Sequence, residues 1–292
     1  MKPMSGTKAD LDRLKYPAYG SVKGDGIRVN IYDRLCRTKS LKPLPNIYTR
    51  TRLESYPVLE KLEAEITTVE DLADPESFNK ATSAFMRHKG EPPLFMWIFD
   101  MIVEGVHFDK RWDMMQKLEL PPFARILQQT KLENRKKVDD YIAGALEAGY
   151  EGVILRHGDS MYKFGTATVT EGQLLKVKPM EDAEGVLEGF EEGMINTNEK
   201  KTNELGRSKR SSAKAGLIPS GMVGTLLVRH PIWGIVRVAG IKDDLALDMF
   251  RNFPKYKGRL TTFKYQAHGT LDAPRIAKFK GFRSPDDMTL PD

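Results

Sequence analysis

Short apolar runs separated by glycines occupy the last third of the chain. This pattern restricts the possible fold of the chain more strongly than any other feature of the sequence. A helical pattern over 244–253 interrupts the runs, which read as short strands. The predicted strands include 185–190, 221–229, 233–241 and 260–265. Five short strands with one helix predict a small closed barrel, and separate β-hairpins are the alternative.

The first 180 residues mix strand patterns with helical ones. Every second residue from Ile27 to Ile31 is apolar, which is the period of a half-buried strand over 22–32. The run 94–103 is apolar enough for a buried strand, and Asp100 is its only charge, so this carboxylate needs a structural reason. Helical patterns occupy 56–66, where the pattern runs into a strand, 111–129 and 136–148. The last of these ends at Gly149, where a left-handed cap is easily adopted.

Length and composition fit one large domain or two modest ones. The chain has 292 residues with 40% hydrophobic content, which is enough to bury a substantial core. Pro179 and the acidic pair that follows it predict a boundary near residue 180. We therefore predict an α+β chain with one domain at 1–180 and an OB-type barrel domain at 181–292.

The segment 196–220 differs from the rest of the second domain because it is polar and almost free of large apolar residues. It carries six cations, at Lys200, Lys201, Arg207, Lys209, Arg210 and Lys214. The whole chain has a net charge of +6 and a pI near 9.1, which favours a polyanionic partner. We expect this basic loop to be mobile and to become ordered on a phosphate backbone, and a solvated loop is the alternative.

Cysteine content and the N-terminal segment bear on the cellular compartment. The only cysteine is Cys36, so an internal disulfide and a cysteine-rich zinc cluster are both excluded. The first 15 residues lack the apolar run of a signal peptide, and no later segment has the length and apolarity to span a bilayer. We expect a cytoplasmic protein, in the host cytoplasm if a phage encodes it, with no membrane partner.

Residues 23–28, K-G-D-G-I-R, have the form K-x-D-G-x-R. A lysine amine becomes a nucleophile only after losing its proton, which cationic neighbours or burial favour. Lys176 and Lys178 alternate with apolar residues, so both side chains leave one face of a strand and can serve the same site as Lys23. The two glycines let the backbone approach a bound nucleotide closely. An ordinary hairpin turn is the alternative for the hexapeptide taken alone.

Five further segments follow residues 23–28 in a consistent order. They are Tyr48-Thr49-Arg50, Ala64-Glu65-Ile66, Ile98-Phe99-Asp100, Glu151-Gly152-Val153 and Leu175-Lys176-Val177-Lys178. In these segments and their order, the chain resembles ATP-dependent DNA ligases of the short bacteriophage type, and the resemblance covers nearly the whole chain. The last family motif resembles 274–280, where the match is looser because lysines replace arginines.

The resemblance implies a fold, cofactors and a partner. The implied fold is an adenylation domain of the nucleotidyltransferase, ATP-grasp-like type, with antiparallel sheets and flanking helices, followed by a C-terminal OB-fold β-barrel. The implied cofactors are ATP, with AMP covalently attached to Lys23, and Mg²⁺. The implied partner is nicked double-stranded DNA, which a monomer encircles by domain closure.

The resemblance also assigns roles to individual residues. The implied catalytic residues are Lys23, Asp25, Lys176 and Lys178. Cofactor contacts are implied for the three lysines and for Arg28, Arg50, Glu65, Phe99, Arg275, Lys278 and Lys280. The implied metal ligands are Glu151 and Glu65, with Asp25 as a further candidate. DNA contacts are implied for Arg28 and Arg50 and predicted for the six cations of 196–220. Ribose binding is an alternative role for Glu65, and Trp97 or Phe95 are alternatives to Phe99 as the aromatic residue that stacks on adenine.

Two other classes of protein fit part of this pattern. An RNA ligase or an mRNA capping guanylyltransferase would use the same covalent lysine chemistry. A basic OB-fold protein that coats nucleic acid without catalysis would share the charge and the second domain, but it would form no covalent adduct with AMP.

Overall fold

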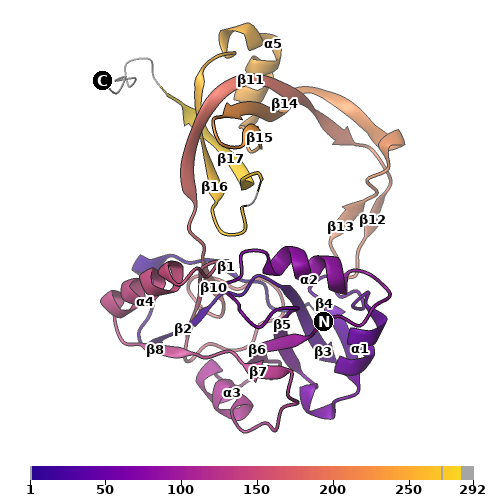
Figure 1. The fold of residues 1–292 in the computed structure, drawn as a ribbon, viewed down its shortest axis with the longest axis vertical. Helices are drawn as coiled ribbons and strands as arrows, with labels where there is room; N and C mark the ends of the chain where they lie inside the picture. The colour runs from indigo at the N-terminus through magenta and orange to yellow at the C-terminus, as the bar shows by residue number, and fades with distance from the viewer. Residues whose placement is uncertain (1, 271, 284–292) are drawn as a thin grey trace. The chain divides into compact units, whose positions relative to one another are not determined.

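The computed structural model of the chain describes residues 2–270 and 272–283. The chain divides into two compact units, Met1–Lys178 and Pro179–Asp292 (Figure 1). The division falls at Pro179, a residue that cannot donate to a strand ladder. Each unit has its own buried apolar core, as expected for independent packing around separate sheets.

One five-stranded sheet of the first unit carries the segments next to Lys23 and Glu151. In spatial order its strands are β1 (Thr7–Lys8), β10 (Leu175–Val177), β9 (Val153–His157), β2 (Ala18–Val22) and β8 (Thr130–Leu132). Strands β1 and β10 are parallel, and the other neighbours are antiparallel. Val22 and Val177 both pair with Val153, so the residues just after β2 and β10 lie on either side of the residues just before β9.

The second sheet of this unit is also five-stranded. In spatial order its strands are β4 (Leu35–Thr38), β3 (Ile27–Tyr32), β5 (Leu62–Thr67), β6 (Phe95–Met101) and β7 (Ala124–Ile126). The apolar residues of β3, β5 and β6 alternate into one buried cluster that includes Val29, Ala64 and Ile98. The strands predicted from alternation near 22–32 and from the apolar run at 94–103 are therefore confirmed.

The described residues of the first unit also form four α-helices. They are α1 (Ile47–Glu54), α2 (Ser77–Phe85), α3 (Phe108–Met115) and α4 (Arg135–Glu147). The side chain of Asn134 caps α4 by accepting the Lys137 N–H at 3.0 Å, and Gly149 just beyond its end has a φ of +86°, as the sequence predicts. None of the helices in the described part of the chain has the length and apolarity to cross a bilayer.

Two of the predicted helices are much shorter than expected. The segment 56–66 forms only a 3₁₀ turn at Pro57–Leu59 before β5 begins, and Lys61 between them has a φ of +64° that no helix accommodates. The predicted helix 111–129 ends at Met115. Two consecutive prolines at 121 and 122 cannot continue a helix, and β7 follows them.

The second unit contains the five strands and the helix predicted for it. In spatial order they are β15 (Gly234–Val238), β14 (Leu217–His230), β11 (Glu181–Asn196), β16 (Leu260–Gln266) and β17 (Arg275–Phe282), with α5 at Asp243–Arg251. The edge strands meet through Ala239, which donates to Ala277 O at 3.1 Å and accepts from Phe279 N–H at 2.8 Å. The order and the helix position fit the OB type, but closure rests on this single bridge rather than on a full ladder.

The basic segment 196–220 forms a hairpin instead of an irregular loop. Strands β12 (Lys200–Thr202) and β13 (Ser208–Arg210) pair antiparallel. The carboxamide of Asn203 accepts the N–H groups of Leu205 and Arg207 at 3.1 and 2.9 Å, which builds the turn. The pairing places Lys200 opposite Arg210 and Lys201 opposite Lys209, and like charges directly opposite each other destabilise a strand pair. We call residues 200–210 the basic hairpin.

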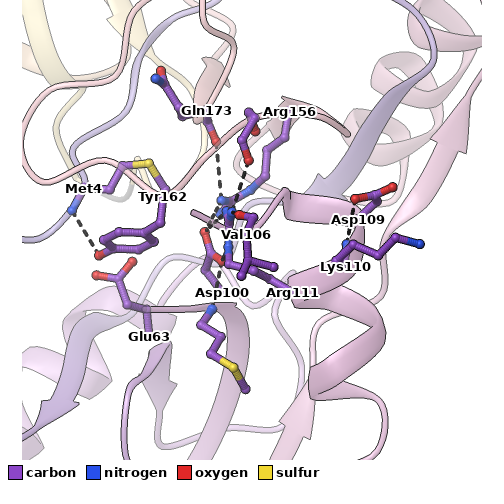
Figure 2. Close-up of polar contacts among 12 residues, drawn as sticks. Met4, Glu63, Asp100, Val106, Asp109, Lys110, Arg111, Arg156, Tyr162 and Gln173 are labelled. Carbon is purple, nitrogen blue, oxygen red and sulfur yellow. Dashed lines mark hydrogen bonds and ion pairs between the residues drawn. The ribbon is translucent and has the colours of Figure 1, made fainter. Parts of the chain in front are cut away.

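The lone charge of β6 joins the two sheets of the first unit. Arg111 of α3 and Arg156 of β9 converge on Asp100 (Figure 2), with contacts of 2.8 Å and 2.5 Å. All three side chains are at most 1% exposed. Burial alone would raise the pKa of the Asp100 carboxyl, but the two guanidiniums, Arg156 foremost, hold it below its ordinary value. The structural reason for this charge is therefore a buried network between sheets.

Replacing Asp100 with Asn should destabilise the fold strongly, because Arg111 and Arg156 would stay buried as like charges without a counterion. We expect the free energy of unfolding, measured by urea denaturation, to fall by about 3–5 kcal/mol. The control is Asp139→Asn, which breaks an exposed pair with Arg135 and should change the midpoint very little. Equal midpoint shifts in both variants would contradict this account.

Candidate functional site

Lys23 lies at the end of β2, where its backbone N–H donates to Gly152 O at 2.9 Å. This bond extends the β2–β9 ladder by one step, so the lysine is held by the sheet rather than by a flexible loop. Its ammonium contacts the Glu151 carboxylate directly. The Lys23 side chain is 20% exposed, whereas Glu151 is 1% exposed, so the lysine reaches from solvent to a buried carboxylate.

Glu151 is shared by two lysines. Its Oε2 contacts Lys23 and its Oε1 contacts Lys178, which immediately follows β10. Burial alone would raise the pKa of Glu151, but the two ammoniums, Lys23 first, hold it below its ordinary value. Glu151 is therefore an ionised buried carboxylate with a cation on each oxygen.

Lys176 brings a third ammonium toward this site from the middle of β10, two residues before Lys178. Burial is the main cause that lowers the pKa of Lys176 to about 8, and nearby cations lower it further. In order of their effect these cations are Lys39, Lys23, Arg28 and Lys178. Lys39 belongs to no motif of the sequence, and only the fold brings its position after β4 near Lys176 of β10.

Glu65 lies on β5 directly opposite Arg28 of β3. Its Oε1 accepts the backbone N–H of Gly26 at 3.2 Å. Burial raises the pKa of Glu65, against the opposing effect of Lys23 and Arg28. A Cβ on Gly26 would lie 2.5 Å from Ile66 O and 3.1 Å from Glu65 Cγ, so the glycine is needed for β5 to approach this closely. Asp25 beside it is buried.

Arg28 is held by Glu63, a residue that the sequence did not single out. One Arg28 nitrogen lies 2.8 Å from both Glu63 oxygens, and Glu63 is fully buried. The guanidinium also lies 5.1 Å from the centroid of the Phe99 ring, and Arg156 lies 5.8 Å from the same ring. Arg28 is thus anchored by a buried carboxylate, and it shares the Phe99 ring with Arg156 of the buried Asp100 network.

Two aromatic residues of β6 face the same side as Glu65. Phe99 borders the two guanidiniums, while Trp97 pairs directly with Glu65 and donates from Nε1 to Thr67 Oγ1 at 3.2 Å. Both rings are partly exposed. Either ring can therefore offer a face to a planar ligand, and the register places Trp97 nearer Glu65 along the strand.

The remaining predicted site residues belong to other elements of the chain. Arg50 is on α1, where its guanidinium donates to Leu44 O at 3.3 Å. Arg275, Lys278 and Lys280 are on β17 of the second unit. Lys280 forms an ion pair with Asp182, and Arg275 donates to His268 O at 3.4 Å. The cations of the basic hairpin are exposed. Their roles stay predictions.

The described residues contain no cluster of three or more His, Cys, Asp or Glu side chains that could coordinate a metal ion. Glu151 and Glu65 offer single carboxylates near Lys23. Mg²⁺ keeps several waters and is commonly bound by one or two carboxylates together with substrate phosphates. The donor set of the first unit fits a metal of this kind only when a phosphate supplies further oxygens.

Comparisons with known proteins agree on one fold. A DNA ligase from Thermococcus fumicolans is 27% identical over 195 residues, which are 62% of this chain and 34% of that protein. The chain therefore spans about a third of this curated relative. No family model matches the sequence.

Two solved structures extend over nearly the whole chain. A Chlorella virus DNA ligase-adenylate has a TM-score of 0.54 at 23% identity, covering 98% of this chain and 99% of that one. A structure from a study of Lig E DNA ligases has a TM-score of 0.71 at 22% identity, covering 97% of this chain and 100% of that one. The chain therefore has the α+β fold of the short DNA ligases, with an adenylation-type unit followed by an OB-type unit.

Proposed function

We propose that the chain is an ATP-dependent DNA ligase that seals 5′-phosphate/3′-hydroxyl nicks in duplex DNA. The observation that carries this proposal is the contact of Lys23 with the buried Glu151 carboxylate, which also binds Lys178, next to Lys176. A nucleophilic lysine, a buried carboxylate and phosphate-binding cations are the groups that phosphoryl transfer needs in one place.

The proposed reaction has three phosphoryl transfers. The Lys23 amine forms a bond to the α-phosphorus of ATP as the bond to pyrophosphate breaks, which leaves a lysyl-AMP phosphoramidate. AMP then passes to the 5′ phosphate of the nick, and the neighbouring 3′ hydroxyl displaces AMP. Positioning and charge stabilisation supply most of the catalysis in such transfers, and the first unit offers both.

The chain's own residues divide these tasks. Lys23 must lose a proton before it attacks, and Glu151 is the group in contact with that ammonium. Lys176 and Lys178 are assigned to the α-phosphate, since both leave β10 toward Lys23. Glu65 is assigned to the ribose hydroxyls or to the metal, and Phe99 or Trp97 to the adenine face.

Mg²⁺ would be held by Glu151 or Glu65 together with phosphate oxygens and water. When bound, it supplies positive charge to the reacting phosphates. The residues present fit this role because Glu151 and Glu65 each lie close to cations that a phosphate would also bind.

The DNA partner is assigned to basic residues of both units. Arg28 and Arg50 are proposed to contact the nick phosphate, and Arg275, Lys278 and Lys280 to contact pyrophosphate. The basic hairpin and nearby Lys214 are proposed to bind duplex backbone, because a polyanion relieves the repulsion between its opposed cations. We propose that a monomer closes around the nick. A cytoplasmic location, which a single buried Cys36 suits, remains part of the proposal.

Lys23→Ala should abolish the covalent AMP adduct, because it removes the amine that is proposed to attack the α-phosphorus of ATP. Intact-protein mass spectrometry after incubation with ATP and Mg²⁺ should show AMP added to the wild-type protein and none to the variant. Lys137→Ala, on the exposed side of α4, should keep the adduct. An adduct on the Lys23 variant would refute the assignment, and an adduct from GTP but not ATP would indicate a guanylyltransferase.

Neutralising the basic hairpin should weaken DNA binding in a salt-dependent way. In one variant, Lys200, Lys201, Lys209 and Arg210 are changed to Gln. The plot of the logarithm of the DNA-binding constant against the logarithm of salt concentration should become less steep, by about 0.9 for each lost phosphate contact. Fluorescence anisotropy with nicked duplex measures this slope. A control with Lys89, Lys110, Lys117 and Lys137 changed to Gln removes the same charge from exposed positions. An equal slope change in both variants would exclude a specific role for the hairpin.

Nucleotide binding should take up protons at pH values above the pKa of Lys176. This pKa is about 8, so at pH 9 most of the Lys176 amine is neutral, and a bound phosphate should recharge it. At pH 6.5 the amine is already charged and takes up none. Calorimetry in two buffers of different ionisation enthalpy, with an ATP analogue whose α and β phosphates are joined by methylene, measures the uptake. Unchanged uptake at pH 9 in Lys176→Ala would rule out this explanation.

A further inference from the structure

The N-terminal segment 4–9 runs along the strand that carries Lys176. Strand β1 pairs parallel with β10, with Thr7 opposite Leu175 and Lys8 opposite Lys176. The Thr7 N–H donates to Leu174 O at 3.1 Å, and the Ala9 N–H donates to Lys176 O at 2.9 Å. Consequently the backbone of this segment is fixed relative to the lysine.

Gly6 lies where the Lys176 side chain crosses the segment. A Cβ on Gly6 would lie 2.6 Å from Lys176 Cε and 3.0 Å from Leu174 O, and real Cβ atoms do not come as close as the first distance. Gly6 is not among the residues with positive φ, so its backbone conformation does not itself require glycine. A side chain at position 6 would therefore meet the end of the lysine stem first, and then Leu174 O and Leu174 Cδ2 at 3.0 and 3.1 Å.

The residues before Gly6 are also fixed. Met4 is fully buried and its N–H donates to the Tyr162 hydroxyl at 3.4 Å. Ser5 donates to Gly165 O at 2.6 Å and accepts from Ala167 N–H at 2.8 Å. The backbone at Gly6 is therefore bonded on both sides, so a new side chain there would displace the end of Lys176 more easily than it would move the strand.

We propose that Gly6 is a positioning residue for Lys176: by lacking a side chain it lets the lysine cross the segment 4–9 and hold its ammonium beside the Lys23 site. This inference deepens the proposed function and rests on it for its catalytic consequence. The effect of Gly6 on the position of the Lys176 ammonium does not depend on any reaction.

The surroundings of Lys176 make its position measurable. Burial has the largest effect on the pKa of its ammonium, and four nearby cations, Lys39, Lys23, Arg28 and Lys178, add to that effect. A methyl group at position 6 would displace the ammonium from its place among these charges. The pKa of Lys176 in Gly6→Ala should then rise from about 8 toward the ordinary lysine value.

A double-mutant cycle tests whether Gly6 acts through Lys176. In single-turnover assays with ATP and Mg²⁺, Gly6→Ala should slow AMP-adduct formation by about 10- to 100-fold, as expected when a catalytic group is displaced by about 1 Å. In the Lys176→Ala background the clashing Cε is absent, so the same substitution should cost less than about twofold. Equal losses in both backgrounds would mean that Gly6 is only structural and would overturn the inference.

An NMR titration tests the geometry without any catalysis. With ¹³Cε-labelled lysine, the Lys176 signal is identified by its loss in Lys176→Ala, and its titration midpoint is compared in wild type and Gly6→Ala. We expect an upward shift of the midpoint, and an unchanged midpoint would overturn the inference. Gly144→Ala on α4 is the matched control, because its Cβ would meet no atom within 4 Å, and its midpoint should equal that of wild type. If wild-type protein forms no adduct with any nucleotide, the proposed function fails while this titration still decides the role of Gly6.

Discussion

The structure of the site depends on one buried carboxylate, Glu151, and on the two lysines that it binds. A carboxylate that is 1% exposed stays ionised only when cations pair with it. Lys23 follows β2 and Lys178 follows β10, and both strands flank β9. The ion pairs therefore form only when these three strands pair in the observed register, because a slip of one residue would turn each lysine to the opposite face. Folding of the sheet and assembly of the site are one event.

A second buried network extends this dependence to the other sheet. Arg156 reaches from β9 to Asp100 of β6, and Arg28 reaches from β3 to Glu63 of β5. Both guanidiniums lie near the Phe99 ring. Buried ion pairs contribute little net stability but cost much when one partner is lost. We therefore interpret the network as a device that fixes the relative position of the two sheets, and with it the distance between Lys23 on one sheet and Glu65 on the other.

Local residue patterns predicted most of the strands and the order of the site motifs. They did not predict contacts that depend on how distant segments pair and pack. Alternation gave β3, the apolar run gave β6, and five strands with one helix gave the OB-type unit. Motif order indicated that Lys23, Glu151 and Lys178 belong to one site, and the structure brings them into contact. The roles of Glu63, Lys39 and Gly6 were not found, because each arises from packing between segments far apart in the chain. The helix predicted over 111–129 ends at Met115, because helical spacing of apolar residues does not outweigh the prolines at 121 and 122, which cannot continue a helix.

The central claim is that Glu151 holds Lys23 in place for attack on ATP. The most direct measurement is the rate of AMP-adduct formation on Lys23 in Glu151→Gln, by single-turnover mass spectrometry with peptide mapping, alongside circular dichroism to verify the fold. A neutral amide cannot bind two ammoniums as the carboxylate does, so we predict a loss of about 100-fold or more in a folded protein. Formation of the adduct on Lys23 at the wild-type rate would contradict the account.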